Sequence, residues 1–170
     1  MYHTQEHRFL RLSAPKKCDE KDAWLGIGYY FWDEHEDAIR WGNNSKRRTG
    51  RFDIYESLID CENVLDTVFN ESHYRFWIAQ IEKVAKNWIK KTDKKLTIRE
   101  LNDWFREKAI WSEVSGIMFQ DLPQNPDYLL VSDFFYRKRI QLVAFNNGIV
   151  LSFDWLDVYV CLERNPDVRP

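Results

Sequence analysis

The sequence predicts an α+β fold in one domain that spans residues 1–170. The expected elements run in the order strand, loop with strand and helix, strand, two helices and further strands, which differs from the regular strand–helix alternation of a doubly wound sheet. Apolar residues at helical spacing lie in the middle of the chain, and alternating or aromatic stretches lie on either side. A hydrophobic content of 44% and a charged content of 31% in 170 residues are typical of a globular chain with a buried core.

A strand, a loop and a second strand are expected first. Residues 1–12 alternate weakly and predict a short strand around residues 1–4, followed by a helix or a turn. The charged segment 13–23 predicts a loop. The stretch "WLGIGYYFW" is rich in β-forming residues but is interrupted by Gly26 and Gly28. This pattern indicates a loop that leads into a strand, with close approach of the backbone at the glycines.

A short helix and further extended segments follow. Asp33 and Glu36 have capping-box spacing, so a helix is expected to begin at residue 34 and to end near Trp41. After the loop "NNSKRRTG", the segment "RFDIYESLI" alternates as a strand does. The next segment, "ENVLDTVF", extends the pairing or begins the following element.

Two amphipathic helices are expected in the middle of the chain. Residues 71–91 carry apolar side chains at helical spacing, namely Phe76, Trp77, Ile81, Val84, Trp88 and Ile89. Thr97 and Glu100 form a second capping box, which opens a helix over residues 98–110. Such apolar stripes are typical of core packing, and a partner surface is the alternative.

Strands return in the last third of the chain. The segment "GIMFQDLPQNPDYLLVSDFF" predicts strand and loop. The segment "RIQLVAFNNGIVLSF" predicts two strands that form a hairpin about Asn146, Asn147 and Gly148. The stretch "WLDVYVCLE" predicts a last strand or a short helix.

Composition argues against several functional classes. A net charge of −2 does not favour nucleic-acid binding, and the basic runs at 46–48 and 137–139 are interpreted as solvated loops. Three widely spaced cysteines without a CxxC pair, together with four scattered histidines, give no zinc pattern, so no metal is expected. The polar N-terminal segment lacks the apolar region of a signal peptide, and no run has the length of a membrane span. We therefore expect a cytoplasmic protein without membrane contact.

The unusual feature is an aromatic content of 16%, with eight tryptophans, and a concentration of aromatic residues in "GIGYYFWDEHEDAIRWG". An aromatic-rich core and a slot for a flat ligand both explain this segment. It is not a dinucleotide-binding fingerprint, because its glycines precede a strand and the third glycine is missing. Glu56, Asp60 and Asp133 form no recognisable catalytic acid pair and are interpreted as surface or capping carboxylates.

Three short segments nevertheless form a recognisable set. They are "MYHTQ" with His3, "GIGYYF" with Gly26, Gly28, Tyr30 and Phe31 followed by Trp41 on the expected helix, and the late strand "RIQLVAF" with Gln141. In this order they resemble the ADP-ribosyltransferase superfamily, in the branch of diphtheria toxin and the poly(ADP-ribose) polymerases. That branch has a histidine in a first strand, a "GxGxYF" segment that leads into a helix with a second aromatic, and a glutamate on a late strand.

The resemblance implies a split antiparallel β-sheet core of the ADP-ribosyltransferase type, with residues 70–125 as a helical insertion and NAD as a substrate. It implies catalytic roles for His3, Tyr30 and Gln141, and NAD binding by His3, Thr4, Gly28, Tyr30 and Trp41. Tyr30 and Trp41 would sandwich the nicotinamide ring, since aromatic faces stack in offset geometry. His3 would hydrogen-bond a ribose hydroxyl through a neutral imidazole of fixed tautomer.

Two positions depart from the family pattern. Thr4 stands where the family usually has glycine, and its Cβ narrows the slot. Gln141 replaces the glutamate by a neutral amide, which hydrogen-bonds but does not offset a developing positive charge as a carboxylate does. Chain extension in the family is associated with that glutamate, so mono-ADP-ribosylation is expected in place of polymer synthesis. If the strand face that holds Gln141, Val143 and Phe145 were the solvent face, Gln141 would be only a surface amide.

Three functions remain open at this point. The first is a mono-ADP-ribosyltransferase that modifies a protein or nucleic-acid acceptor, as a bacterial toxin or antiphage effector with a cognate inhibitor protein as partner. The second is a catalytically silent module that binds NAD. The third is an interaction protein whose tryptophans and helices, 71–91 and 98–110, form a partner surface.

Overall fold

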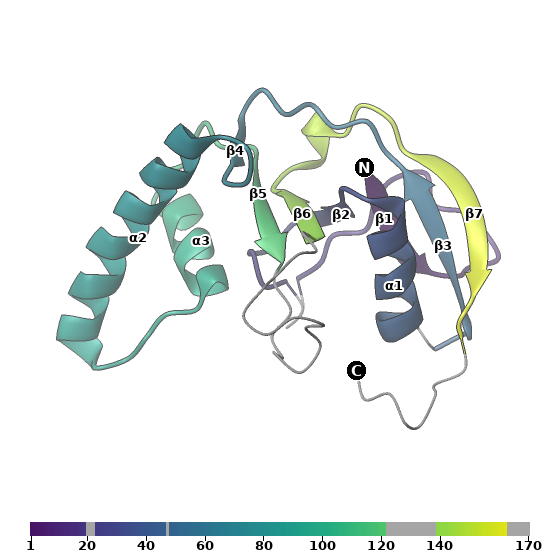
Figure 1. The fold of residues 1–170 in the computed structure, drawn as a ribbon, viewed down its shortest axis with the longest axis horizontal. Helices are drawn as coiled ribbons and strands as arrows, with labels where there is room; N and C mark the ends of the chain where they lie inside the picture. Colours follow the sequence, from purple (N-terminus) through teal and green to yellow (C-terminus); the bar gives the residue numbers. More distant parts are fainter. Residues whose placement is uncertain (20–22, 47, 122–138, 163–170) are drawn as a thin grey trace, which may run out of the picture.

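The computed structural model describes residues 1–19, 23–46, 48–121 and 139–162. Within these ranges the chain has an α+β fold with a seven-stranded, mostly antiparallel sheet and three α-helices (Figure 1). The strands are β1 (Tyr2–Glu6), β2 (Tyr29–Trp32), β3 (Arg51–Glu56), β4 (Val64–Asp66), β5 (Gly116–Asp121), β6 (Arg139–Ala144) and β7 (Asp154–Val160), and the helices are α1 (His35–Ser45), α2 (Glu71–Thr92) and α3 (Ile98–Glu107). None of these helices combines the length and the apolar character that a membrane crossing requires.

The sheet is continuous but opens near its middle. Its strand order is β4-β5-β6-β2-β1-β3-β7, and all neighbours are antiparallel except β4 and β5. Strand β1 pairs with β3 along its whole length, from Tyr2 to Glu6, but its register with β2 consists of the pair Tyr2 and Trp32. The two halves of the sheet therefore meet at one point and diverge beyond it.

The helices form two layers at opposite ends of the sheet, each with its own core (Figure 1). Helix α1 and the strands beside it bury Trp32, Ala38, Phe52 and Ile54. Helices α2 and α3 and the strands near them bury a larger cluster, which consists of Leu25, Leu65, Trp77, Leu101, Phe105, Trp111, Ile117, Val143 and Phe145. The stripe of α3 is thus core, as its spacing predicts, whereas the longer α2 buries Trp77 and leaves Phe76 and Trp88 exposed.

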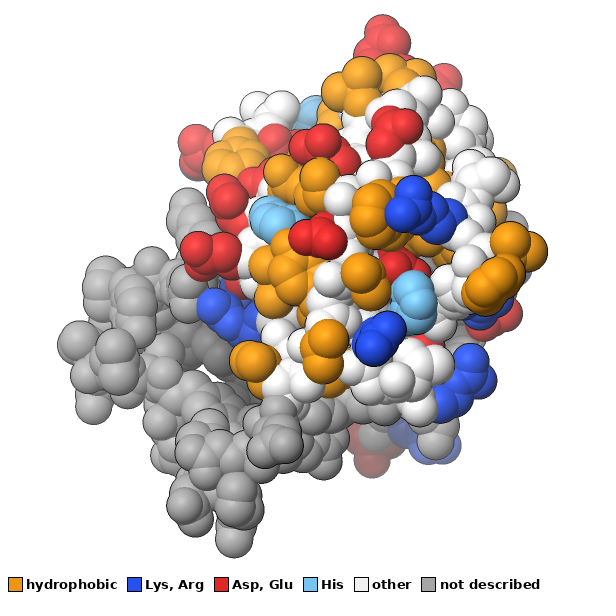
Figure 2. All heavy atoms as spheres, turned by 90° about the vertical axis from the view of Figure 1, so that its right-hand side faces the viewer, with side chains coloured by type: hydrophobic (Ala, Val, Ile, Leu, Met, Phe, Trp, Pro, Cys, Tyr) orange, Lys and Arg blue, Asp and Glu red, His pale blue; other side chains and the backbone are white. Residues whose placement is uncertain are grey.

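Strand β7 forms one edge of the sheet, beside β3. Its exposed apolar side chains, Leu156 and Val158 among them, alternate with the exposed carboxylates of Asp154 and Asp157. Figure 2, which views the molecule from this side, shows hydrophobic and charged side chains interspersed over the surface. Charges on an edge strand discourage pairing with a second chain.

The two expected capping boxes have different outcomes. At α3, the Thr97 hydroxyl accepts from the backbone N–H of Glu100 and the Glu100 carboxylate accepts from that of Thr97, so the prediction is confirmed. At α1 the prediction is wrong, because the N-cap is Glu34 and its side chain makes no capping bond. Asp33 directly follows β2, and its N–H donates to the Ile140 carbonyl at 3.0 Å. The helix also continues past Trp41 to Ser45.

The expected hairpin about Asn146, Asn147 and Gly148 is also wrong. Strand β6 lies inside the sheet and β7 lies at its edge, with β2, β1 and β3 between them. The Asn146 side chain accepts from the Gly148 N–H at 3.0 Å and closes a short 3-10 turn over Asn147–Ile149. After this turn Leu151 N–H donates to the Leu58 carbonyl at 2.8 Å, so the chain runs along the segment that precedes β4 and not back along β6.

The range 70–125, expected to be a helical insertion, is only partly helical. Its first part forms α2 and α3, whereas Gly116–Asp121 forms β5, which lies between β4 and β6 in the sheet. The buried apolar residues of α2 and α3 therefore share a core with Ile117 of β5, a strand from the same range. The expected strand and loop beyond Asp121, up to residue 135, lie outside the described residues.

Gly28 shows why the "GIG" segment needs a residue without a side chain. A Cβ at this position would lie 2.5 Å from the Ala144 carbonyl oxygen and 2.5 Å from Val143 Cγ2, both on β6. The close approach predicted for the glycines is therefore present at Gly28, and its partner is the neighbouring strand.

We expect the substitution Gly28→Ala to lower the free energy of unfolding by about 1–3 kcal/mol, because the added methyl overpacks the β2–β6 pair. Urea unfolding monitored by tryptophan fluorescence measures this change. Gly148→Ala is the matched control, since its Cβ would meet no backbone atom within 4 Å but only the side-chain oxygen of Asn146, at 3.1 Å in an exposed turn. Equal unfolding free energies for the two variants would contradict this account of Gly28.

Candidate functional site

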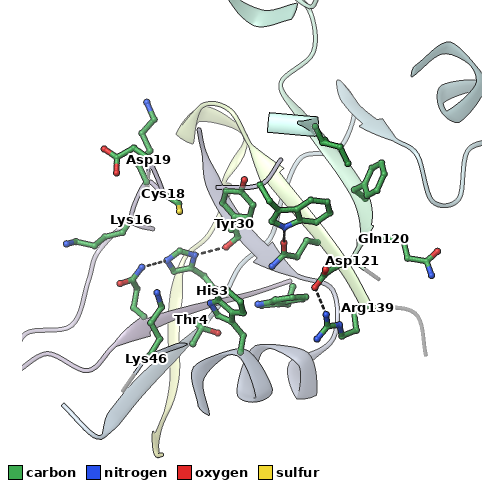
Figure 3. A pocket seen from close by; sticks show the side chains of 18 residues that line it. His3, Thr4, Lys16, Cys18, Asp19, Tyr30, Lys46, Gln120, Asp121 and Arg139 are labelled. Carbon is green, nitrogen blue, oxygen red and sulfur yellow. Dashed lines mark hydrogen bonds and ion pairs between the residues drawn. The ribbon is translucent and has the colours of Figure 1, made fainter. Parts of the chain in front are cut away.

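A cavity of about 820 Å³ lies between α1 and α3, over the strands that surround the opening of the sheet (Figure 3). Its size is within the range of small-molecule and cofactor sites. It is lined by His3, Thr4, Gln5, Lys16, Lys17, Cys18, Asp19, Trp24, Tyr30, Trp32, Trp41, Lys46, Ile98, Phe119, Gln120, Asp121, Arg139 and Gln141. Five of the six site residues named from the sequence are in this set, namely His3, Thr4, Tyr30, Trp41 and Gln141. The sixth, Gly28, is not in the lining and instead packs against β6.

His3 bridges the opening between β1 and β2. Its Nδ1 lies 2.8 Å from the Tyr30 carbonyl oxygen, and a carbonyl only accepts, so Nδ1 carries the proton. Nε2 is then an acceptor, and it lies 3.2 Å from the Gln5 side-chain nitrogen. The side chain is only 3% exposed, and burial, with a smaller effect of the Lys46 charge, lowers the pKa of His3 to about 4 although the bond to Tyr30 opposes the shift. His3 is therefore a neutral imidazole of fixed tautomer at pH 7.

Thr4, next to His3, is fixed toward α1. Its hydroxyl donates to the Ala38 carbonyl at 2.9 Å, and the residue is buried. The Cβ that distinguishes Thr4 from the family's glycine thus belongs to a side chain that joins β1 to the helix. This bond connects β1, whose residues His3 and Thr4 line the cavity, to α1, which carries Trp41.

Tyr30 forms a fixed wall of the cavity. Its hydroxyl donates to the Gly26 carbonyl at 2.7 Å and accepts from the Leu25 N–H at 2.9 Å. Burial raises the pKa of Tyr30 well above its usual value. The Tyr30 hydroxyl is therefore occupied by its hydrogen bonds to the backbone of residues 25 and 26. Tyr30 contributes its ring and its carbonyl to the site.

Two tryptophans contribute further aromatic surface. The rings of Trp32 and Trp41 lie 6.0 Å apart between centroids and are tilted by 50°. Trp32 is not among the site residues expected from the sequence, but it both belongs to the α1 core and lines the cavity. Its place follows from the register, which sets Trp32 opposite Gln141 and hence on the same face of the sheet.

Gln141 is not a surface amide. It is 4% exposed, lines the cavity, and accepts through Oε1 from the Trp24 indole N–H at 2.7 Å. Val143 and Phe145 on the same strand face are buried as well, so this is a core face. Trp24 was missed by sequence reasoning, and its position directly before the "LGIG" stretch was the only signal.

Charged side chains divide the cavity into two ends. Lys16 and Lys46 lie on the side of His3, and Asp121 and Arg139 lie on the other side, where Arg139 Nη2 donates to Asp121 Oδ2 at 2.8 Å (Figure 3). Lys46 and Arg139 belong to the two basic runs that were interpreted as solvated loops. That interpretation is wrong for Arg139, which begins β6, whereas Lys46 follows the end of α1 outside any helix or strand and lines the cavity. Sequence alone gave no sign of it, because only the end of α1 and the β5–β6 register bring them to the cavity.

No metal-binding cluster is found among the described side chains, where no group of three or more His, Cys, Asp or Glu could hold an ion. Comparison with protein-family models, with curated proteins and with solved structures found no match to this chain. What the cavity does must therefore be argued from its own residues.

The buried state of His3 predicts a pH dependence of stability. The unfolded imidazole titrates near 6.5 and the folded one near 4, so between these pH values the unfolded chain binds more protons at this position. The contribution of His3 is complete above pH 6.5 and is lost as the pH falls toward 4, by about 3 kcal/mol at most.

Urea unfolding at several pH values between 4 and 7 measures this effect. The variant His3→Gln, which cannot gain a proton, should show a shallower loss of stability over this range than the wild-type chain. Parallel pH profiles for the two proteins would contradict the buried, neutral assignment of His3.

Proposed function

We propose that the chain binds NAD in this cavity and transfers ADP-ribose from it to a single site on a macromolecular acceptor. The observation that carries the proposal is the convergence of His3, Tyr30, Trp41 and Gln141, which lie on three distant segments of the sequence, on one cavity. The resemblance to ADP-ribosyltransferases rests on these positions in the sequence and contains no information about the distances between them. Their convergence is not required by core packing, since Gln141 and His3 are polar.

The chemical character of the walls suits the parts of NAD. The rings of Tyr30, Trp32 and Trp41 offer apolar faces for the planar nicotinamide. Lys16, Lys17 and Lys46 offer positive charge for the diphosphate, which a compact ammonium group binds well. His3 Nε2 is an acceptor, and it can accept a hydrogen bond from a ribose hydroxyl when the Gln5 side chain moves away from it.

The proposed reaction requires a rigid nicotinamide while its bond to the ribose breaks. The transition state develops positive charge on the ribose, so preorganised groups around the cavity matter more than mobile ones. The residues that line this part of the cavity are held by hydrogen bonds within the protein: Tyr30 by the turn at 25–26, and Gln141 by Trp24. A neutral amide at residue 141 favours transfer of one ADP-ribose unit over chain extension.

A silent NAD-binding module is the second candidate. The observation that favours it is again Gln141, whose amide carries no charge and whose Oε1 is already engaged by Trp24 at 2.7 Å. Binding needs only the aromatic and cationic walls, whereas turnover also needs stabilisation of the transition state. The two candidates differ in whether nicotinamide is released.

We expect Trp41→Ala to weaken NAD binding by about 10- to 100-fold, because stacking of an aromatic side chain on a flat ring contributes about 1–3 kcal/mol. Isothermal titration calorimetry with NAD measures the affinity, and mass spectrometry of released nicotinamide measures turnover. Trp88→Ala is the control, since Trp88 lies on the exposed side of α2 and does not line the cavity. An unchanged affinity of the Trp41→Ala variant would contradict a stacking role.

The substitution Gln141→Glu separates the enzyme from the silent module. For an enzyme we expect the rate of nicotinamide release to stay within about tenfold of wild type, because a Glu oxygen can accept from Trp24 as the amide oxygen does. A wild-type chain that binds NAD without releasing nicotinamide, together with a Gln141→Glu variant that does release it, would identify the silent module. Single-turnover measurements at saturating NAD keep binding and chemistry apart.

A further inference from the structure

Asp121 places a carboxylate in the lining of the cavity, near the amide of Gln141. Asp121 ends β5, and the register of β5 with β6 sets Asp121 opposite Arg139 and Phe119 opposite Gln141. Residues 119 and 121 alternate with 120, so Asp121 and Gln141 share one face as diagonal neighbours, about 7–8 Å apart between backbones. Both side chains line the cavity. A carboxylate is therefore present within reach of the position where the family has one.

The Asp121 carboxylate is held at one oxygen and open at the other. Oδ2 accepts from Arg139 Nη2 at 2.8 Å, and none of the residues that the structure describes hydrogen-bonds Oδ1. The side chain is 24% exposed, so a ligand in the cavity can reach it. Arg139 in turn lies over the ring of Trp32, with its guanidinium carbon 6.0 Å from the ring centroid. Figure 3 shows this pair on the side of the cavity away from Lys16 and Lys46.

The surroundings of Asp121 strengthen it as a proton acceptor. Partial burial raises the pKa of Asp121 above that of an ordinary aspartate, and the Asp37 carboxylate adds to this effect. The Arg139 guanidinium acts in the opposite direction and favours the ionised form. The Asp121 carboxylate is therefore a stronger proton acceptor than an ordinary exposed aspartate.

We infer that Asp121 supplies the negative charge that Gln141 lacks and acts as the catalytic carboxylate of the ADP-ribosyl transfer, with Arg139 as the residue that positions it. This inference rests on the proposed function. The bond between ribose C1′ and the nicotinamide nitrogen breaks, and its electron pair goes to that nitrogen, which loses its positive charge. The acceptor's nucleophilic atom, or a water oxygen, bonds to C1′, and its proton passes to Asp121 Oδ1 and then to solvent. The Asp121 charge also offsets the positive charge that develops on the ribose in the transition state.

The variant Asp121→Asn tests the inference, with NAD as the probe and water as the acceptor. We expect nicotinamide release to fall at least about 100-fold, the usual contribution of a general base, while the Kd for NAD changes by less than about threefold. Asp154→Asn is the matched control, because it removes one exposed carboxylate from β7, none of whose residues lines the cavity. This control should keep the wild-type rate.

A second substitution tests the chemistry apart from the fold. In the double variant Asp121→Asn and Gln141→Glu, a carboxylate returns to the neighbouring position on the same face, and we expect at least a tenfold recovery of the rate. The single variant Asp121→Asn leaves the Arg139 guanidinium without its ion-pair partner, which can lower the thermal unfolding midpoint. If it does, the double variant Asp121→Asn and Arg139→Gln, which lacks this guanidinium, is compared with the wild-type chain in its place.

The outcomes separate the inference from the function on which it rests. A wild-type chain that releases nicotinamide, with an Asp121→Asn variant of equal rate, overturns the role of Asp121 and leaves the proposed function standing. A loss of rate that follows an equal loss of NAD affinity also overturns it, because Asp121 would then only bind the ligand. A wild-type chain that neither binds NAD nor releases nicotinamide overturns both.

Discussion

The cavity depends on one constraint, the divergence of β1 and β2 beyond the pair Tyr2 and Trp32. Past that point a side chain connects the two strands, since His3 Nδ1 donates to the Tyr30 carbonyl at 2.8 Å. This bond joins the two halves of the sheet beyond their backbone pairing, fixes the tautomer of the imidazole and directs the Nε2 lone pair toward the Gln5 side chain. A ladder of backbone bonds at the same place would close the opening and remove the cavity floor.

Charge and shape in the cavity are arranged together. Lysines lie on one side, an aspartate held by an arginine on the other, and aromatic rings around them. Such an arrangement favours a ligand that has an anionic centre and a flat, electron-poor end, as NAD has. Arg139 and Asp121 are partly buried, so fewer water molecules screen their charges, whereas Lys16 and Lys17 are exposed.

The sequence predicts the elements well where the signal is local. The capping box of Thr97 and Glu100, the amphipathic α2 and the strand after Gly28 are of this kind. The predictions are wrong where a tertiary contact overrides the local pattern, as when Asp33 bonds to Ile140 instead of capping α1, or when the chain after Asn147 follows Leu58. Five site residues came from motif resemblance, but Trp32 and Asp121 required the strand register, which no spacing in the sequence contains. Trp24 required the hydrogen bond between its indole N–H and Gln141.

The central position of β6 has a consequence for how the chain is made. β2 and β5 do not pair with each other, and both are joined through β6, which begins at residue 139. A nascent chain that has not yet exposed residues 139–144 leaves these two strands with open edges, and His3 and Tyr30 have no Gln141 to meet. Contacts between residues this far apart in sequence form late and slowly. The cavity is therefore completed only after residues 139–144 have been synthesised and have paired with β2 and β5.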